Sequence, residues 1–302
     1  MILVVGATGT LGLEICRRLS EHQTGVRALA RETADPSRLS ALQNAGVDIS
    51  WGDLKDPASL SRACHGVDVV ISTASSTLSR QSGDSIETVD RLGQLALVEA
   101  ARRSGVQHFT FVSIPRSPVH ESPLTRAKAE AERSLMESGI AYTILAANFF
   151  MEIWLSPALG FDYPHQKAVI FGNGHAPVSW ISYRDVAEFA VRSHRAPGAR
   201  NRILEIGGPQ DISPLDVVKI FERVSGSSFE CQLVPDEALL AQMNQANDPL
   251  TESFAKLQLE YAHGCVMDSS PALAVMPMEL TGVEQYAASV CGQAAPASYG
   301  HS

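Results

Sequence analysis

The sequence predicts an α/β fold in which a doubly wound parallel sheet is followed by a small C-terminal lobe. Short β-branched runs alternate with amphipathic helical stretches through the first half of the 302-residue chain, as they do in repeated strand–helix units. A glycine-rich segment separates the first strand from the first helix. After Leu145 the alternation gives way to loops rich in proline, glycine and aromatic residues. Sheets of this kind bind ligands at the carboxyl ends of their strands.

The first half contains six strand-like and five helix-like segments. Strands are expected over residues 2–5, 25–30, 48–51, 67–72, 108–113 and 141–145, and helices over residues 11–21, 37–45, 57–64, 85–104 and 123–138. Asp56-Pro57 and Ser122-Pro123 are typical pairs of an N-cap and a first helical residue, and Gly139 is typical of the position that follows a helix.

The second half is less regular. Helices are expected over residues 183–194, 213–225 and 235–244, and strands near residues 169–171 and 203–206 are expected to rejoin the architecture of the first half. We therefore divide the chain into a sheet domain at residues 1–148, a lobe at residues 149–291 that partly rejoins the core around residues 176–206, and a tail at residues 292–302 that we expect to be disordered.

The composition excludes several classes of protein. With 45% hydrophobic and 19% charged residues the chain can bury a sizeable core, which argues against a disordered or fibrous protein. The net charge of 24 − 33 = −9 argues against nucleic-acid binding. Residues 1–147 carry 15 basic and 16 acidic residues, whereas the rest carry 9 and 17, so the lobe holds a net −8. A pocket in such a lobe favours neutral apolar or aromatic ligands over anions.

Neither a disulfide framework nor a metal site is expected, because the five cysteines form no CxxC pair and have no ligand spacing to a histidine pair. The chain starts almost directly on an apolar strand without a basic leader, so we expect a cytoplasmic protein. The apolar segment at residues 140–155 is too short to span a membrane and contains Asn148 and Glu152. We interpret it as a buried strand that runs into a loop or helix.

The strongest motif is the glycine-rich turn after the first strand. Gly6 permits a tight turn, Gly9 lets the backbone approach a diphosphate, and Gly12 allows close packing of the helix on the strand. The spacing is GxxGxxG rather than the usual GxGxxG, and the alternative is a plain tight turn. In a strand–turn–helix context it predicts that the amide groups at the helix N-terminus hold the diphosphate of a dinucleotide. The residues of this predicted site are Gly6, Thr8, Gly9, Thr10, Leu11 and Gly12.

The end of the second strand favours NADP(H) over NAD(H). Arg31 stands where a guanidinium can bind a 2′-phosphate, whereas sites that prefer NAD place an acidic residue there. The alternative is a solvated loop arginine, and the neighbouring Glu32 weakens the prediction.

Two further strand ends complete the predicted cofactor site. After the third strand, Asp53 can accept a hydrogen bond from the adenine amino group while Leu54 covers the ring, although a turn aspartate is an equal alternative. After the fourth strand, the small side chains leave room for ribose and diphosphate; they are Thr73, Ala74 and Ser75.

Several motifs in order along the chain resemble the NmrA-like type of the atypical short-chain dehydrogenase/reductase family. They are GATGTLG, VRALAR, WGDLKDPASL, GVDVVISTASS and AKAEAERSLMESGIAYTILAANFFME. The resemblance covers about the first two hundred residues and is nearest to the branch of the Ycf39-like photosystem assembly factors, with quinone and isoflavone reductase-like enzymes more distant. It implies an NAD(P)-binding Rossmann fold with a small substrate lobe. It does not imply catalysis, because the family includes reductases, redox sensors and assembly factors.

The tyrosine of the superfamily's YxxxK motif is absent. Lys128 stands at the lysine position, but Leu124 occupies the position four residues earlier. A literal YxxxK at Tyr163–Lys167 contains Pro164 and is interpreted as a chance match.

Lys128 lies on the apolar stripe of its predicted helix, together with Leu124, Ala131 and Leu135. The resemblance to isoflavone reductases implies that it contacts the nicotinamide ribose and takes part in catalysis. The alternative is a lysine whose stem lies on apolar surface while its head reaches solvent.

Other candidates follow the fifth and sixth strands. Ser113 is placed to bind a substrate oxygen and is our second catalytic candidate, although a plain strand end is an alternative. Asn148 and Phe149, with Phe150, are expected to wall the nicotinamide side of the cofactor, and ordinary core is the alternative for the phenylalanines. Nothing in the spacing selects a proton donor among the loop residues His120, Glu121 and His175.

Two functions remain open. The first is an NADPH-dependent reductase of an apolar carbonyl, enone or quinone-like molecule, and the second is a non-catalytic NADP(H)-binding sensor or assembly factor that acts through protein contacts. The inward lysine favours the first and the missing tyrosine the second. Under both we expect a monomer or homodimer with no nucleic-acid partner, no membrane span and no metal.

Overall fold

Seven parallel strands form the main sheet, in the order β10-β6-β5-β4-β1-β2-β3. The computed structural model describes residues 1–78, 81–115 and 121–292. The strands of the sheet are β1 (Ile2–Val5), β2 (Val26–Ala30), β3 (Asp48–Trp51), β4 (Val69–Ser72), β5 (His108–Ser113), β6 (Ala141–Ala147) and β10 (Arg202–Ile206). The strand order reverses between β1 and β4, and ligands of doubly wound sheets bind at this kind of switch point.

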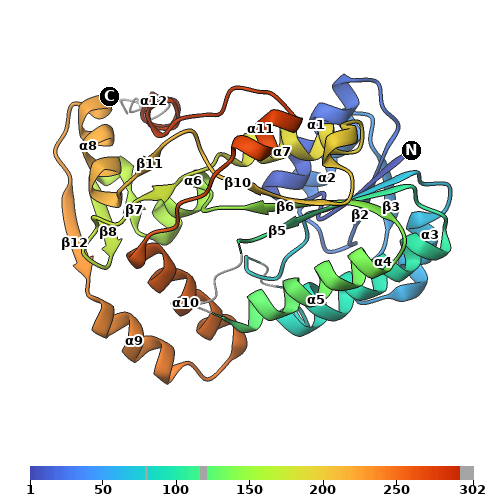
Figure 1. Ribbon diagram of the computed structural model, residues 1–302, viewed down its shortest axis with the longest axis horizontal. Helices are drawn as coiled ribbons and strands as arrows, with labels where there is room; N and C mark the ends of the chain where they lie inside the picture. Colours follow the sequence, from blue (N-terminus) through green and yellow to red (C-terminus); the bar gives the residue numbers. More distant parts are fainter. Residues whose placement is uncertain (79–80, 116–120, 293–302) are drawn as a thin grey trace, which may run out of the picture.

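Helices cover both faces of the main sheet (Figure 1). Alternate residues of each strand face opposite layers, so Ile2 and Val4 pack on one side while Leu3 and Val5 pack on the other. The first layer contains α1 (Thr10–Glu21), α2 (Pro36–Asn44), α7 (Tyr183–Ser193) and α11 (Ser270–Val275). The second layer contains α3 (Pro57–Cys64), α4 (Gln94–Arg103) and α5 (Pro123–Glu137).

The predicted α/β fold is confirmed, and most boundaries agree within a few residues. The Asp56 carboxylate accepts from the backbone N–H of Ala58, Ser122 forms a capping box with Thr125, and Gly139 has a φ of +82°. The single helix expected over residues 85–104 is wrong, because a π-helix, η1 (Ile86–Gly93), precedes α4. Its five-residue hydrogen-bond spacing is a feature that the 3.6-residue periodicity of the sequence does not reveal.

The C-terminal lobe has small sheets of its own. β12 (Glu230–Val234), β8 (Lys167–Phe171) and β7 (Phe161–Asp162) form one, and β11 (Asp211–Ile212) and β9 (Val178–Ser179) form the other. The strand expected near residues 169–171 therefore does not rejoin the main sheet, whereas the strand near residues 203–206 does so as β10. A run of apolar residues predicts a strand without specifying its partner.

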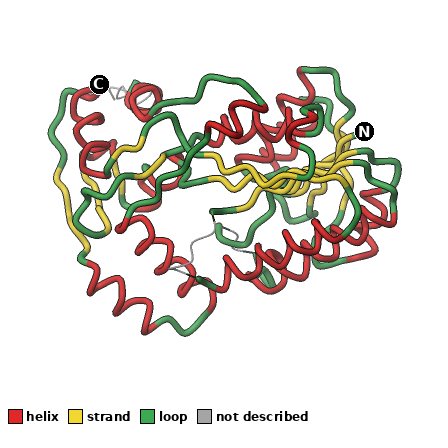
Figure 2. The backbone as a smooth tube through the Cα atoms, viewed as in Figure 1, coloured by secondary structure: helices red, strands yellow, loops and turns green. Residues whose placement is uncertain are grey.

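Helices complete the lobe around these strands, as Figure 2 shows. They are α6 (Met151–Trp154), α8 (Pro214–Ser225), α9 (Asp236–Gln245), α10 (Pro249–His263) and α12 (Val283–Cys291), with short turns at η2 (Pro157–Leu159) and η3 (Tyr163–His165). A further turn, η4 (Pro197–Ala199), packs against β10 and α11 of the sheet domain. The helix α10 was not predicted from the sequence; it packs against α5 and so connects the lobe to the sheet domain. Within the described ranges, no helix has the length and apolar character needed to cross a membrane. The predicted tail lies outside the described residues from residue 293 onward.

A buried histidine makes the fold sensitive to acid. His108 on β5 is 5% exposed, and its ring contacts the hydroxyl of Thr143 at 3.1 Å. Burial, together with the nearby His194 and Arg200, lowers the pKa of His108 to about 4. The unfolded chain binds a proton at this residue below its ordinary pKa near 6.5, whereas the folded chain does so only near pH 4.

We therefore expect the free energy of unfolding to fall between about pH 6.5 and pH 4 by up to roughly 3 kcal/mol from this group. In urea unfolding at a series of pH values, His108→Gln should show a shallower acid loss than the wild type. His22→Gln, at an exposed position, is the matched control and should keep the wild-type profile. An unchanged acid slope in His108→Gln would contradict this account.

Candidate functional site

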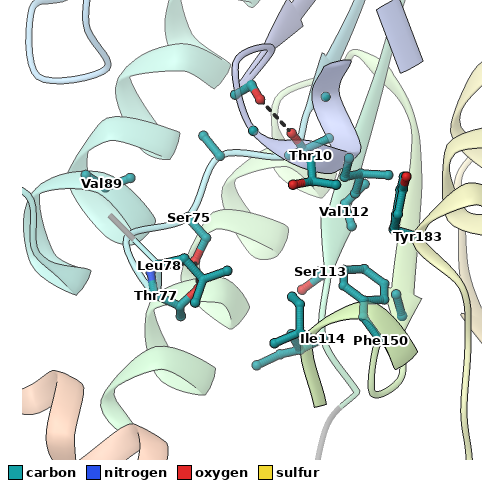
Figure 3. Close-up of a pocket in the computed structure, with 18 of the residues that line it drawn as sticks. Thr10, Ser75, Thr77, Leu78, Val89, Val112, Ser113, Ile114, Phe150 and Tyr183 are labelled. Carbon is teal, nitrogen blue, oxygen red and sulfur yellow. Dashed lines mark hydrogen bonds between the residues drawn. The ribbon is translucent and has the colours of Figure 1, made fainter. Parts of the chain in front are cut away.

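A cavity of about 620 Å³ lies along the carboxyl ends of the main-sheet strands and extends to the lobe. It is lined by the segments that follow β1, β2, β3, β4, β5 and β6, and also by residues of α5, α7 and α10. In Figure 3, Ser75, Thr77 and Leu78 lie on one side, opposite Ser113, Ile114 and Phe150. The long shape, with one end at β3 and the other at the lobe, suits an extended ligand.

The glycine-rich turn brings the N-terminus of α1 to the cavity. Gly6 has a φ of +83°, and a side chain there would meet Thr73 Oγ1 at 2.7 Å. A Cβ at Gly12 would lie 2.2 Å from the carbonyl oxygen of Gly6, so only glycine allows α1 to start so close to the turn. The first turn of α1 has no acidic residue, and Gly9 at the N-cap supplies no side-chain cap. The positive end of the helix is thus available for an anion.

Charged side chains cluster at the β2 and β3 end of the cavity. Arg31 Nη1 lies 2.7 Å from Asp84 Oδ2, and Lys55 forms an ion pair with the other oxygen of the same carboxylate. Lys55 Nζ also lies 3.4 Å from Asp53 Oδ2. Asp53 further accepts a hydrogen bond from the backbone N–H of Lys55, which is the turn role that the sequence left open as an alternative. Two cations and two carboxylates therefore gather where the 2′-end of a dinucleotide was predicted.

Lys128 projects from α5 into the wall of the cavity, as the apolar stripe predicted. The residue is 5% exposed, and its ammonium lies 5.2 Å above the centre of the Phe111 ring. Its nearest ionic partner is Asp90 on η1, with Nζ 3.7 Å from Oδ1. Across residues 1–78, 81–115 and 121–292, the Lys128 ammonium donates no hydrogen bond, so its N–H groups are available to a ligand.

Ser113 is engaged by a buried carboxylate. Its hydroxyl donates to Glu132 Oε1 at 2.5 Å, and both side chains are about 2% exposed. Glu132 lies one helical turn after Lys128, on the same side of α5. Glu132 was not among the predicted site residues, although its i, i+4 spacing from an inward lysine is a signal that it shares the buried face.

Asn148 contributes a second polar atom that is unpaired among the described residues. Its side-chain N–H donates to the carbonyl oxygen of Cys265 at 2.9 Å, whereas its Oδ1 is buried and has no hydrogen-bond partner among the described residues. Cys265 also lines the cavity, but burial raises the pKa of its thiol to about 12. This cysteine is therefore not a thiolate nucleophile near neutral pH.

The lobe end of the cavity is aromatic and apolar. Phe149 packs edge-on against Trp154 with ring centroids 4.7 Å apart, and both line the cavity. Two other lobe aromatics, Trp180 and Phe161, are 1% exposed and belong to the lobe core. The unpredicted helix α10 supplies three further cavity residues, Phe254, Leu257 and Glu260.

All of the residues that we predicted to bind the cofactor or to act in catalysis line this single cavity. Among the three loop candidates for a proton donor, Glu121 and His175 do not line it, and His120 lies outside the described residues. The YxxxK sequence at Tyr163–Lys167 does not form a helical pair, as predicted. Tyr163 lies in a short 3-10 turn, and Lys167 is the first residue of β8.

Two unpredicted acid–base groups, Glu152 and Tyr183, also face the cavity. Burial raises the pKa of Glu152, whose carboxylate accepts from Ser182 Oγ and from the backbone N–H of Tyr183. Tyr183 is labelled in Figure 3 on the same side as Val112 and Phe150. Glu152 lies at the start of α6 and Tyr183 at the start of α7, two segments that come together only in the folded chain.

A family model and individual relatives both show which known proteins this chain is similar to. A model of the NmrA-like family matches residues 1–287, further than the first two hundred residues that carry the resemblance. The chain is 31% identical over 287 residues to an NAD(P)H azoreductase of Xenophilus azovorans, covering 92% of this chain and 94% of that protein. It is 32% identical over 239 residues to the photosystem II assembly factor Ycf39 of Cyanophora paradoxa, covering 78% of this chain and 71% of the relative.

Solved structures share the fold. An NADPH-dependent quinone oxidoreductase from Escherichia coli, solved with NADPH, superposes with a TM-score of 0.76 at 22% identity, over 96% of this chain and 99% of that one. This likeness extends through the C-terminal lobe and supports the Rossmann-like architecture of the whole chain.

Proposed function

This chain belongs to the NmrA-like family, and we propose that it is a reductase that binds NADPH and delivers hydride to an apolar carbonyl, enone or quinone-like small molecule. The observation that carries the proposal is a pair of polar groups that have no hydrogen-bond partner among the described residues: the Lys128 ammonium and Asn148 Oδ1, on two residues that line one cavity. Buried polar groups are normally satisfied, so such atoms indicate a ligand that supplies an acceptor and a donor. The ribose hydroxyls and the carboxamide of a nicotinamide riboside supply both.

The rest of the cavity fits the same cofactor. The uncapped N-terminus of α1 and the glycine cradle at Gly6, Gly9 and Gly12 suit a diphosphate. Arg31 and Lys55 suit a 2′-phosphate, which would have to displace Asp84 from the guanidinium. The names of the azoreductase relative and of the Escherichia coli quinone oxidoreductase support a nicotinamide cofactor and a reductive activity.

The chemistry that a bound NADPH supplies is hydride transfer from its nicotinamide ring. Lys128 binds and orients the ribose beside that ring, and its Nζ holds a proton that can pass to the substrate oxygen. Phe149 and Trp154 form an apolar wall that excludes water and favours planar, neutral substrates. Ser113, held by Glu132, presents a fixed hydroxyl oxygen at the end of β5.

The cofactor preference is tested by fluorescence titration. We expect NADPH to bind more tightly than NADH, and Arg31→Ala to weaken NADPH by about tenfold while NADH changes by less than about twofold, because only NADPH carries the phosphate. Arg62→Ala removes the same charge from an exposed position on α3 that does not line the cavity and is the control. A wild-type protein that binds both cofactors equally, with no effect of Arg31→Ala, would disprove the 2′-phosphate assignment.

Catalysis is tested by a screen of quinones, enones and aldehydes with NADPH. For an accepted substrate, Lys128→Ala should lower kcat/KM by about 100-fold or more, because it removes both an orienting group and a proton source. Lys219→Ala, at an exposed position on α8, should leave the rate unchanged. Intact turnover in Lys128→Ala would overturn the catalytic role.

The second candidate is a non-catalytic NADP(H)-binding protein that acts through a protein partner. Leu124 in place of the superfamily tyrosine favours it, as does the similarity to Ycf39 assembly factors. Tight binding of NADPH with no turnover of any acceptor in the screen would favour this candidate over the reductase.

A further inference from the structure

Asp90 is a fully buried carboxylate to which neither the family resemblance nor the sequence pattern gives a role. It lies on the π-helix η1, behind the wall of the cavity, and is 0% exposed. Its Oδ2 accepts two hydrogen bonds from Ser76, from the backbone N–H at 2.9 Å and from the hydroxyl at 2.6 Å. Its Oδ1 has no hydrogen-bond partner among the described residues and lies 3.7 Å from Lys128 Nζ.

The opposite charges of Asp90 and Lys128 stabilise each other in the buried site. A buried carboxylate or ammonium is strongly unfavourable unless an opposite charge lies nearby. The separation of 3.7 Å is an ion-pair distance but is longer than a hydrogen bond. Asp90 therefore neutralises the ammonium without taking up its N–H groups, which stay available on the cavity side.

The same carboxylate is connected to the loop after β4. Ser76 directly follows Thr73, Ala74 and Ser75, which line the cavity. The start of α4 holds this loop as well, because Gln94 donates to the carbonyl oxygen of Ala74 at 3.1 Å and accepts from Ser72 Oγ at 2.9 Å. The π-helix is packed tightly in place, since a Cβ at Gly93 would lie 2.9 Å from Leu54 Cβ.

We propose that Asp90 is a positioning residue for Lys128. Its carboxylate holds the Lys128 side chain at the cavity wall and joins it, through Ser76, to the loop that lines the cofactor site. The proposal rests on the proposed NADPH function of the cavity. It places the action of Asp90 at the nicotinamide-ribose end of the cofactor, not at the adenosine end.

Binding of two ligands separates this role from a general structural one. We compare NADPH, by fluorescence titration, with 2′,5′-ADP, which lacks the nicotinamide riboside, by calorimetry. Asp90→Asn should weaken NADPH by about tenfold and change 2′,5′-ADP by less than about twofold, because only NADPH reaches Lys128. Lys128→Met should give the same pattern, and Asp90→Asn/Lys128→Met should bind NADPH no more weakly than Lys128→Met alone.

Asp185→Asn is the matched control, because it removes another buried carboxylate, one whose oxygens accept hydrogen bonds from Thr281 and which does not line the cavity. It should bind both ligands within about twofold of the wild type. Four results would overturn the proposal: unchanged NADPH affinity in Asp90→Asn, equal weakening of both ligands, additive losses in the double variant, or a loss in Asp185→Asn as large as that in Asp90→Asn.

Unfolding experiments test the pair without a cofactor, even if Asp90→Asn cannot be purified. Lys128→Met should lower the melting temperature, because it leaves the Asp90 carboxylate without its counter-charge, and the double variant should recover most of that loss. A double variant no more stable than Lys128→Met would overturn the pairing. A wild-type protein that does not bind NADPH would instead disprove the proposed function, and the unfolding cycle would still decide whether Asp90 and Lys128 act as a pair.

Discussion

The close approach of α1 to the turn after β1 is the constraint on which the site depends. Because the Cβ of any other residue at Gly12 would lie 2.2 Å from the Gly6 carbonyl oxygen, glycine there lets the helix begin immediately above the end of the strand. The positive end of the helix then faces the edge where the ends of β4 and β5 also meet. The segments after the other strands, and the lobe connected through α10, enclose the space in front of this helix end.

Charge is distributed unevenly along the resulting cavity, so its two ends suit different parts of a ligand. At one end, Arg31 and Lys55 share the Asp84 carboxylate, an arrangement that can exchange one anion for another. In the middle, the Lys128 ammonium is neutralised from behind by Asp90 and keeps its donors toward the cavity. At the lobe end the wall is aromatic. A ligand with a phosphate at one end and a planar, weakly polar ring at the other matches this order.

The sequence predicts the parts of the site that depend on local pattern. The turn at Gly6–Gly12 follows from glycine spacing between a strand and a helix, and the inward position of Lys128 follows from the apolar stripe of α5. Asp90 could not be predicted, because the π-helix that carries it departs from the 3.6-residue period. Its partners are also distant in sequence: Ser76 lies in the loop between β4 and η1, and Lys128 lies on α5. The role of α10 escapes for a similar reason, since only its packing against α5 brings Phe254 and Leu257 to the cavity. The pairing of β8 with β12 likewise depends on tertiary packing, and the apolar sequence of β8 does not predict it.

A crystal structure of the protein with NADP⁺ tests the central claim most directly. The account predicts a diphosphate at the N-terminus of α1, the nicotinamide ribose within hydrogen-bond distance of Lys128 Nζ, and Asp90 still paired with that lysine from behind. The cofactor bound with its nicotinamide at the Arg31 end, or with Lys128 turned away from the ribose, would contradict it.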